Sequence, residues 1–60
     1  MFAKIQEKDI QLIDVYACNV DDTLPTEGIG NGDAVIILDP STNTSTVAMF
    51  DADSETWVSI

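Results

Sequence analysis

The sequence has no histidine and a single cysteine, Cys18. A lone cysteine cannot form a disulfide within the chain, and the usual structural zinc sites need histidine or further cysteines. Disulfide and structural-zinc cross-links, with which small domains compensate for a small core, are therefore excluded. With 60 residues in total, the chain is predicted to be one small domain, residues 1–60, which is stabilised by association.

Basic residues are almost absent. Lys4 and Lys8 face eleven acidic side chains, which gives a formal net charge of −9. Affinity for nucleic-acid phosphate comes from Lys and Arg, so direct binding to nucleic acid is excluded. A charged partner is expected to be basic, although acids also serve simply to solvate the turns of a small domain.

Long apolar runs are absent as well. No run approaches the length of a membrane span, and residues 2–6 lack the apolar core and small-residue cleavage site of a secretory signal. A lone thiol also fits a reducing compartment. We therefore expect synthesis and folding in a cytoplasm, with no membrane partner.

The second half of the sequence consists of three β-prone runs, Ala34–Leu38, Thr46–Phe50 and Thr56–Ile60. The intervening residues 39–45 and 51–55 are rich in Pro, Asn, Asp and Ser, which favour tight turns. This pattern predicts three successive strands of an antiparallel meander.

The apolar run Val35–Leu38 is typical of a central strand that is covered on both faces. Alternation along the next two strands assigns one face to Val47, Met49 and Trp57, and the other face to Ala48, Phe50 and Val58. A sheet this apolar on both sides needs a cover. The first half of the chain must provide it in a monomer, whereas a neighbour can provide it in an assembly.

Residues 2–20 fit two periodicities. As a helix, they place Ile10, Ile13 and Ala17 on one stripe; as strands, residues 2–6 lead through the turn Glu7-Lys8-Asp9 into a longer extended run. The Ile, Val, Tyr and Cys side chains are stiff or bulky near the backbone and favour strands. One or two N-terminal strands are therefore expected, with the helix as the alternative.

A short helical turn is predicted near Asp21–Pro25, because an aspartate can cap one turn and Pro25 prevents its continuation. All three glycines follow within residues 28–32, which predicts a tight positive-φ connection into the meander, with Ile29 pointing inward. The predicted fold class is all-β or mostly β: a small antiparallel meander of three C-terminal strands plus one or two N-terminal strands.

Residues capable of chemistry are few. Cys18 has no histidine or nearby cation to lower its pKa, so it is predicted to be a buried packing residue. The acidic turn 51–55 alternates oxygen side chains but lacks the glycine and closing glutamate of a helix-loop-helix calcium loop, which favours a solvated hairpin turn. We predict no catalytic residue, no cofactor and no metal site, and we expect that the chain is not an enzyme.

Binding to another protein is the remaining class of function. Large or adaptable apolar side chains dominate the energetics of protein interfaces. The candidate contact residues are Tyr16, Met49, Phe50 and Trp57.

Short motifs at residues 20–29, 32–39, 50–51 and 56–60 (VDDTLPTEGI, GDAVIILD, FD and TWVSI) resemble a module of head and tail fibre proteins and small structural-region products of tailed bacteriophages and prophages. There, a valine-acidic-leucine-proline turn precedes a glycine-acidic entry to an apolar strand and a closing tryptophan-valine strand. The resemblance implies a non-enzymatic virion part, either a capsid accessory or decoration protein or a component of the head or tail surface. It also implies synthesis in the bacterial host cytoplasm, location in the virion after assembly, and a homo-oligomeric or larger phage structural partner.

Two rival functions stay open. An acidic inhibitor that mimics DNA would present carboxylates to the basic groove of a host nucleic-acid-binding protein, using Asp9, Asp14, Asp21, Asp22, Asp33, Asp39, Asp51 and Asp53. Against it, these acids fall mainly in predicted turns rather than along one face. The other rival is a subunit that only completes a homo-oligomer, which predicts concentration-dependent stability.

Overall fold

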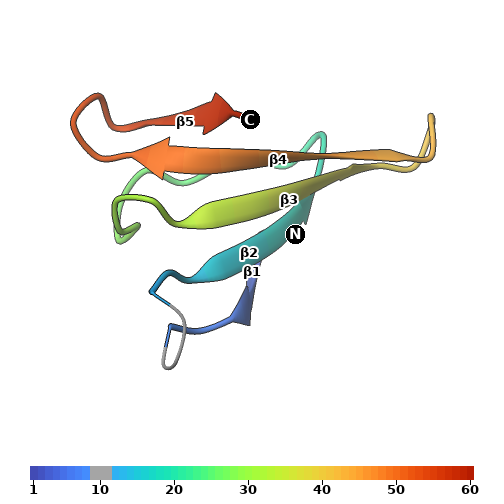
Figure 1. Cartoon of the computed structure of the whole chain (residues 1–60). Coiled ribbons are helices and arrows are strands. Elements are labelled where there is room, and N and C mark those ends of the chain that lie inside the picture. The colour runs from blue at the N-terminus through green and yellow to red at the C-terminus, as the bar shows by residue number, and fades with distance from the viewer. Residues whose placement is uncertain (9–11) are drawn as a thin grey trace.

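The fold was obtained as a computed structural model, which describes residues 1–8 and 12–60. Five strands form one sheet in the order β1-β2-β3-β4-β5 (Figure 1). Their bounds are β1 Ala3–Gln6, β2 Val15–Asn19, β3 Ala34–Asp39, β4 Thr44–Asp51 and β5 Thr56–Ser59. The expectation of an all-β fold is confirmed. The described residues include no helix, and hence none that is long and apolar enough to cross a membrane.

The three C-terminal strands form the predicted antiparallel meander. Val35 pairs with Ala48 between β3 and β4, and Phe50 pairs with Trp57 between β4 and β5. Turns of four residues join these strands, at residues 40–43 and 52–55. Figure 1 shows that the β3–β4 hairpin extends beyond the other strands at one end of the sheet.

The junction between the two halves corrects the prediction, because β2 and β3 are parallel rather than antiparallel, with Tyr16 beside Val35. The sheet is therefore mixed. A parallel pair needs a crossover that returns the chain to the starting end of the sheet. Residues 20–33 make this crossover, and Figure 1 shows them passing behind β3 and β4.

The predicted helical turn at Asp21–Pro25 is wrong. The chain instead makes a tight turn in which the amide of Asp22 donates to the carbonyl oxygen of Asn19 at 3.0 Å, and residues 23–26 follow without regular structure. The carboxylate of Asp22 accepts a hydrogen bond from the preceding amide of Asn19 at 2.8 Å. Because this carboxylate points back toward β2, it cannot cap a helix that starts after it.

The N-terminal segment forms strands, so the helical alternative is wrong for its described residues. β1 pairs antiparallel with β2, and the register shifts between Lys4 and Gln6, which is a β-bulge or a similar irregularity. The predicted turn residue Asp9 and the helical-stripe residue Ile10 lie outside the described residues.

The core lies on one face of the sheet, which we call the inner face. Its buried cluster consists of Tyr16, Cys18, Val35 and Ala48. The crossover covers this cluster with Leu24 and with Ile29, which is predicted from the sequence to point inward. Both the inward position of Ile29 and the burial of Cys18 are therefore confirmed. The crossover acts as the second layer of a two-layer fold.

Aromatic rings close the inner face from opposite edges of the sheet. Phe2, next to β1, stacks on Tyr16 with ring centroids 4.7 Å apart and also meets the edge of Trp57 of β5 at 6.2 Å. Trp57 meets Phe50 edge to face at 5.1 Å. The sheet therefore curls strongly enough to bring side chains from its two edge strands together over the core.

The prediction of which residues share a face is half right. Val47 and Met49 lie on one face of β4 while Ala48 and Phe50 lie on the other, as expected from alternation. The β5 residues are exchanged, because Trp57 pairs with Phe50 and Val58 pairs with Met49. A four-residue turn sets this register, and a slip of one residue exchanges the faces of every side chain in the strand.

Candidate interaction surface

The second face of the sheet carries two rows of apolar side chains that run across the strands. Cross-strand neighbours point to the same side of a sheet, so the registers define these rows. One row consists of Ala3, Ala17, Ile36 and Val47, and the other of Val15, Ala34, Met49 and Val58, with the polar Gln6 beside Val15 at the β1 edge. We call these eight residues the open face.

The open face lacks the cover that the inner face has. Val47 is 40% exposed, Met49 41% and Val58 52%, whereas the inner-face residues Val35 and Ala48 on the same strands are 0% and 2% exposed. The expectation that Val35–Leu38 is covered on both faces is therefore wrong, and Leu38 itself is exposed. Contiguous exposed apolar side chains are typical of interaction sites.

The four predicted contact residues fall in different places. Tyr16 and Phe50 lie in the core, with 6% and 4% of their surface exposed. Trp57 is half-buried on the inner face, where its Nε1 donates to the carbonyl oxygen of Pro25. Of the four, Met49 alone belongs to the open face.

Sequence reasoning named Met49 as a contact residue and missed the other seven members of the open face, of which Val47 and Val58 are exposed. Their apolar character and alternation are visible in the sequence, but so are those of the core residues beside them. The core residues and the open-face residues differ only in that the crossover covers the face on which the core residues lie. The face that is covered depends on the path of residues 20–33, which no local pattern predicts.

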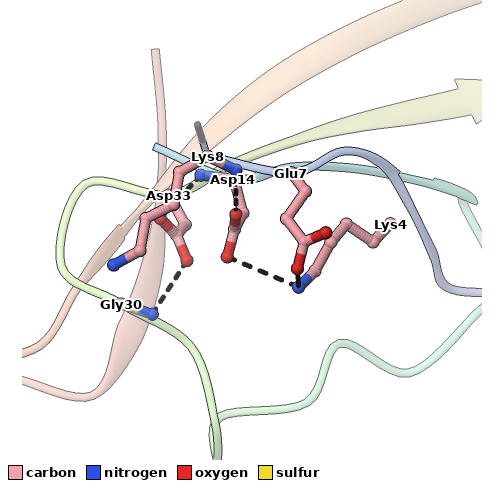
Figure 2. A network of polar contacts seen from close by, with 6 residues as sticks. All are labelled: Lys4, Glu7, Lys8, Asp14, Gly30 and Asp33. Carbon is pink, nitrogen blue, oxygen red and sulfur yellow. Dashed lines mark hydrogen bonds and ion pairs between the residues drawn. The ribbon is translucent and has the colours of Figure 1, made fainter. Parts of the chain in front are cut away.

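Charged residues gather at the ends of the strands, where they hold loops together (Figure 2). Asp33 is 4% exposed, and its two carboxylate oxygens accept hydrogen bonds from the amides of Gly30 at 2.9 Å and Asp14 at 3.1 Å. It thereby joins the end of the crossover to the start of β2. Its role is structural, since both oxygens are used within the chain.

Asp14 extends the same network toward β1. Its carboxylate accepts a hydrogen bond from the amide of Lys8 at 2.6 Å and lies 3.6 Å from the ammonium of Lys4, which is 3.8 Å from Glu7. The hydrogen bond from Lys8 and the attraction of Lys4 lower the pKa of Asp14 below its ordinary value. These contacts hold Lys4 of β1 and the residues that follow it, Glu7 and Lys8, close to Asp14 at the start of β2.

Two further carboxylates stabilise turns near the opposite end of β2 and β3. Asp22 accepts hydrogen bonds from the Met1 amino group and the Asn19 amide, which lower its pKa. Asp39 accepts from the hydroxyl and the amide of Ser41 at 2.6 and 3.1 Å, and these bonds lower its pKa as well. None of these carboxylates belongs to either row of the open face.

The acidic segment 51–55 is the predicted hairpin turn. Asp51 accepts hydrogen bonds from the amide of Asp53 and the hydroxyl of Ser54, each at 3.1 Å. Within residues 1–8 and 12–60, no group of three or more acidic or cysteine side chains is placed to hold a metal ion. Burial raises the pKa of the Cys18 thiol, which opposes formation of a thiolate.

A hollow of about 340 Å³ lies beside the β3–β4 turn, between Asn19, Leu38 and Asn43. It is an open depression between polar turn residues and adjoins the open face at Leu38. No ionisable pair of the kind that performs acid-base chemistry lines it, since Asp39 is its sole charged residue. The open face is therefore the better candidate for binding another protein.

Comparison with known proteins adds no relative. No family model matches the sequence, and neither characterised proteins nor solved structures include a chain with significant similarity to it. The resemblance to phage structural modules therefore stays a prediction.

Proposed function

We propose that the chain is a non-enzymatic assembly protein that binds another protein surface through the open face. Following the resemblance of its motifs, we place that assembly in the virion of a tailed bacteriophage, as a capsid accessory or decoration protein or a head or tail surface component. The observation that supports the proposal is the pair of uncharged apolar rows that crosses the sheet without a cover.

Contact with water is unfavourable for the apolar side chains of the open face. Burial of apolar surface is worth roughly 25 cal/mol per Å², and a domain of this size has little stability to spare. A partner that covers Val47, Met49 and Val58 therefore stabilises both the complex and the fold. The sheet also fixes the backbone of these residues before binding, so little backbone entropy is lost when the partner docks.

The acidic-mimic alternative draws its support from net charge alone. The carboxylates of Asp14, Asp22, Asp33 and Asp39 accept hydrogen bonds within the chain, where they hold loops and turns. A mimic also has no use for two uncharged apolar rows across a sheet. The open face therefore favours assembly over mimicry.

The proposal is tested by asking whether virions contain the chain. Particles would be induced from a host that carries the gene, purified on a density gradient and analysed by mass spectrometry for peptides of this sequence. Val47→Lys places a charge on the open face, and Val20→Lys makes the same change at an exposed valine outside it. We expect the wild type and Val20→Lys in the particles and a loss of Val47→Lys.

Absence of the wild-type chain from particles would contradict the virion assignment. Equal incorporation of both variants would contradict the role of the open face. Salt separates assembly from mimicry, because raising ionic strength from about 0.1 M to 1 M shortens the Debye length from roughly 10 to 3 Å. Apolar attachment should survive this change, whereas capture by a basic groove should be lost.

A further inference from the structure

We propose that Asn31 is a site of spontaneous chemical modification, in which water converts it to aspartate or isoaspartate through a cyclic imide, and that the fold suppresses this reaction by holding the Asn31-Gly32 pair in two hydrogen bonds. The pair lies in the connection that leads into β3. Neither residue belongs to the rows of the open face, so the site is independent of the proposed assembly surface.

The fold uses each residue of the pair for a structural reason. Gly32 has a φ of 87°, which residues with a side chain rarely adopt, and its amide donates to the carbonyl oxygen of Phe50 at 2.9 Å. The side-chain oxygen of Asn31 accepts a hydrogen bond from the amide of Ala52 at 3.0 Å. Together these bonds join the entry to β3 to the end of β4 and the turn after it. They also place an asparagine directly before the residue that hinders attack on it least, because glycine has no side chain.

The reaction begins when the backbone nitrogen of Gly32 loses its proton and attacks Cγ of Asn31. A bond forms between this nitrogen and Cγ, the bond from Cγ to Nδ2 breaks, and ammonia leaves with the amide proton. Water then hydrolyses the cyclic imide at either of its carbonyl carbons. Hydrolysis at Cγ gives aspartate, and hydrolysis at the main-chain carbonyl carbon gives isoaspartate. No oxidant or reductant is needed.

Both reacting groups are occupied in the folded chain. The N–H of Gly32 is directed at Phe50, and the carboxamide of Asn31 is directed at Ala52. The nitrogen can attack Cγ only after both hydrogen bonds open. Opening two typical hydrogen bonds lowers the population of the reactive state by at least about tenfold. The fold therefore slows the reaction that this pair of residues otherwise favours.

Asp33 limits opening from the other side of the pair. It is 4% exposed, and its carboxylate accepts a hydrogen bond from the amide of Gly30 at 2.9 Å (Figure 2). Its own amide donates to the carbonyl oxygen of Gly30 at 3.1 Å, and its carbonyl oxygen accepts from the amide of Phe50 at 2.8 Å. The residues on both sides of the pair are therefore held in place, so the pair opens only when this short loop loosens.

The isoaspartate product cannot keep the same contacts. Its main chain runs through the former side chain, which adds the Cβ methylene to the backbone between Gly30 and Gly32. The side-chain oxygen beside Ala52 also becomes part of the main chain. Modification should therefore loosen the junction between the entry to β3 and the β4–β5 turn. Asn31→Asp keeps the backbone and a side-chain acceptor, so it separates the effect of the added charge from that of the altered backbone.

The test incubates the whole chain in buffer and in urea at mildly alkaline pH. Tandem mass spectrometry assigns each replacement of an amide by a carboxylate to Asn19, Asn31 or Asn43. Val20 and Thr44 follow the other two asparagines, and their branched side chains hinder the attack, so these asparagines serve as internal controls. We expect Asn31 to react first in urea, and to react at least about tenfold more slowly in buffer.

A variant beside the pair tests whether loosening of this loop controls the rate. Asp33→Ala removes the acceptor that holds Gly30 and should speed the modification of Asn31 in buffer by about tenfold. Ser41→Ala removes a hydrogen bond from the β3–β4 turn, beyond the other end of β3, and should leave the rate unchanged. Circular dichroism of the same samples shows whether each variant is folded. If Asp33→Ala is unfolded, Asp33→Asn replaces it, because it keeps one acceptor oxygen.

Equal rates for Asn31 in buffer and in urea would overturn the protection by the fold. A rate in urea no faster than that of Asn19 and Asn43 would overturn the site itself. Equal rates for the folded Asp33 variant and Ser41→Ala would overturn control by the loop. These outcomes are separate from the presence of the chain in virions, which tests the proposed function.

Discussion

The indole Nε1 of Trp57, on the last strand, donates a hydrogen bond of 2.9 Å to the carbonyl oxygen of Pro25 in the crossover. The two residues are 32 positions apart in sequence. This bond fastens the irregular crossover to the inner face at the edge strand of the sheet. Because the crossover lies on the inner face, the open face is left without a cover.

Trp57→Phe should lower the free energy of unfolding by about 1–2 kcal/mol, since it removes the hydrogen bond to Pro25 and part of the buried ring. The ring contact with Phe50 is largely kept. Urea unfolding followed by circular dichroism measures the change, and Thr56→Ser on the same strand serves as the control. Equal stability of Trp57→Phe and wild type would show that the crossover is held by other contacts.

Asp33→Ala should lower the free energy of unfolding by roughly 2–4 kcal/mol, because it leaves the amides of Gly30 and Asp14 without an acceptor in a part-buried site. Asp33→Asn conserves shape and one acceptor oxygen, so it should cost less. The same denaturation assay compares the two variants. If both variants cost the same, charge rather than the paired acceptors would be the stabilising feature.

Glu55→Asn should stabilise the chain by about 0.5–1 kcal/mol. Glu55 and Asn43 each end a four-residue turn with positive φ, at 56° and 54°, a conformation that Asn tolerates better than Glu. The reciprocal change Asn43→Glu should destabilise by a similar amount. Thermal melts of both variants measure the effect, and a destabilised Glu55→Asn would contradict this account of the turns.

Cys18 should react slowly with thiol reagents in the folded chain. Its side chain is 4% exposed, and burial raises the pKa of the thiol, so little thiolate is available. We expect the rate of reaction with an aromatic disulfide at pH 8 to rise steeply once urea unfolds the chain. Fast labelling of the folded chain would show that the inner face opens readily.

Stability should fall as the solution is acidified. The pKa values of Asp14, Asp22 and Asp39 are lowered from 3.8 in the folded chain, because hydrogen bonds favour their charged forms. Their contribution is therefore fully present above the unfolded value of 3.8 and is lost as pH falls through the lower folded values.

Unfolding free energies measured between about pH 5 and pH 2 should show this loss. Asp39→Asn removes one of the three groups without changing its shape, so the difference in stability between wild type and variant should shrink toward low pH. A difference that stays constant across the range would contradict the assigned hydrogen bonds. The difference is the useful quantity, because general repulsion among the acids changes in the opposite direction.

Local residue patterns determined the strands of the C-terminal meander. β-branched and aromatic runs separated by Asp, Pro, Asn and Ser predict strands and turns wherever they occur, and β3, β4 and β5 follow them within two residues. The burial of Cys18 and the inward position of Ile29 were also predicted, because burial of apolar side chains in the core is favourable.

Only the tertiary structure decided the relationships that create the candidate surface. The parallel pairing of β2 and β3 and the path of residues 20–33 join parts of the chain that are distant in sequence. The register that puts Val58 rather than Trp57 beside Met49 depends on the geometry of the four-residue turn between β4 and β5. Both faces of the sheet are apolar, so composition does not distinguish core from interface. The distinction arises because one connection, fastened by Trp57 and Asp33, covers the inner face alone.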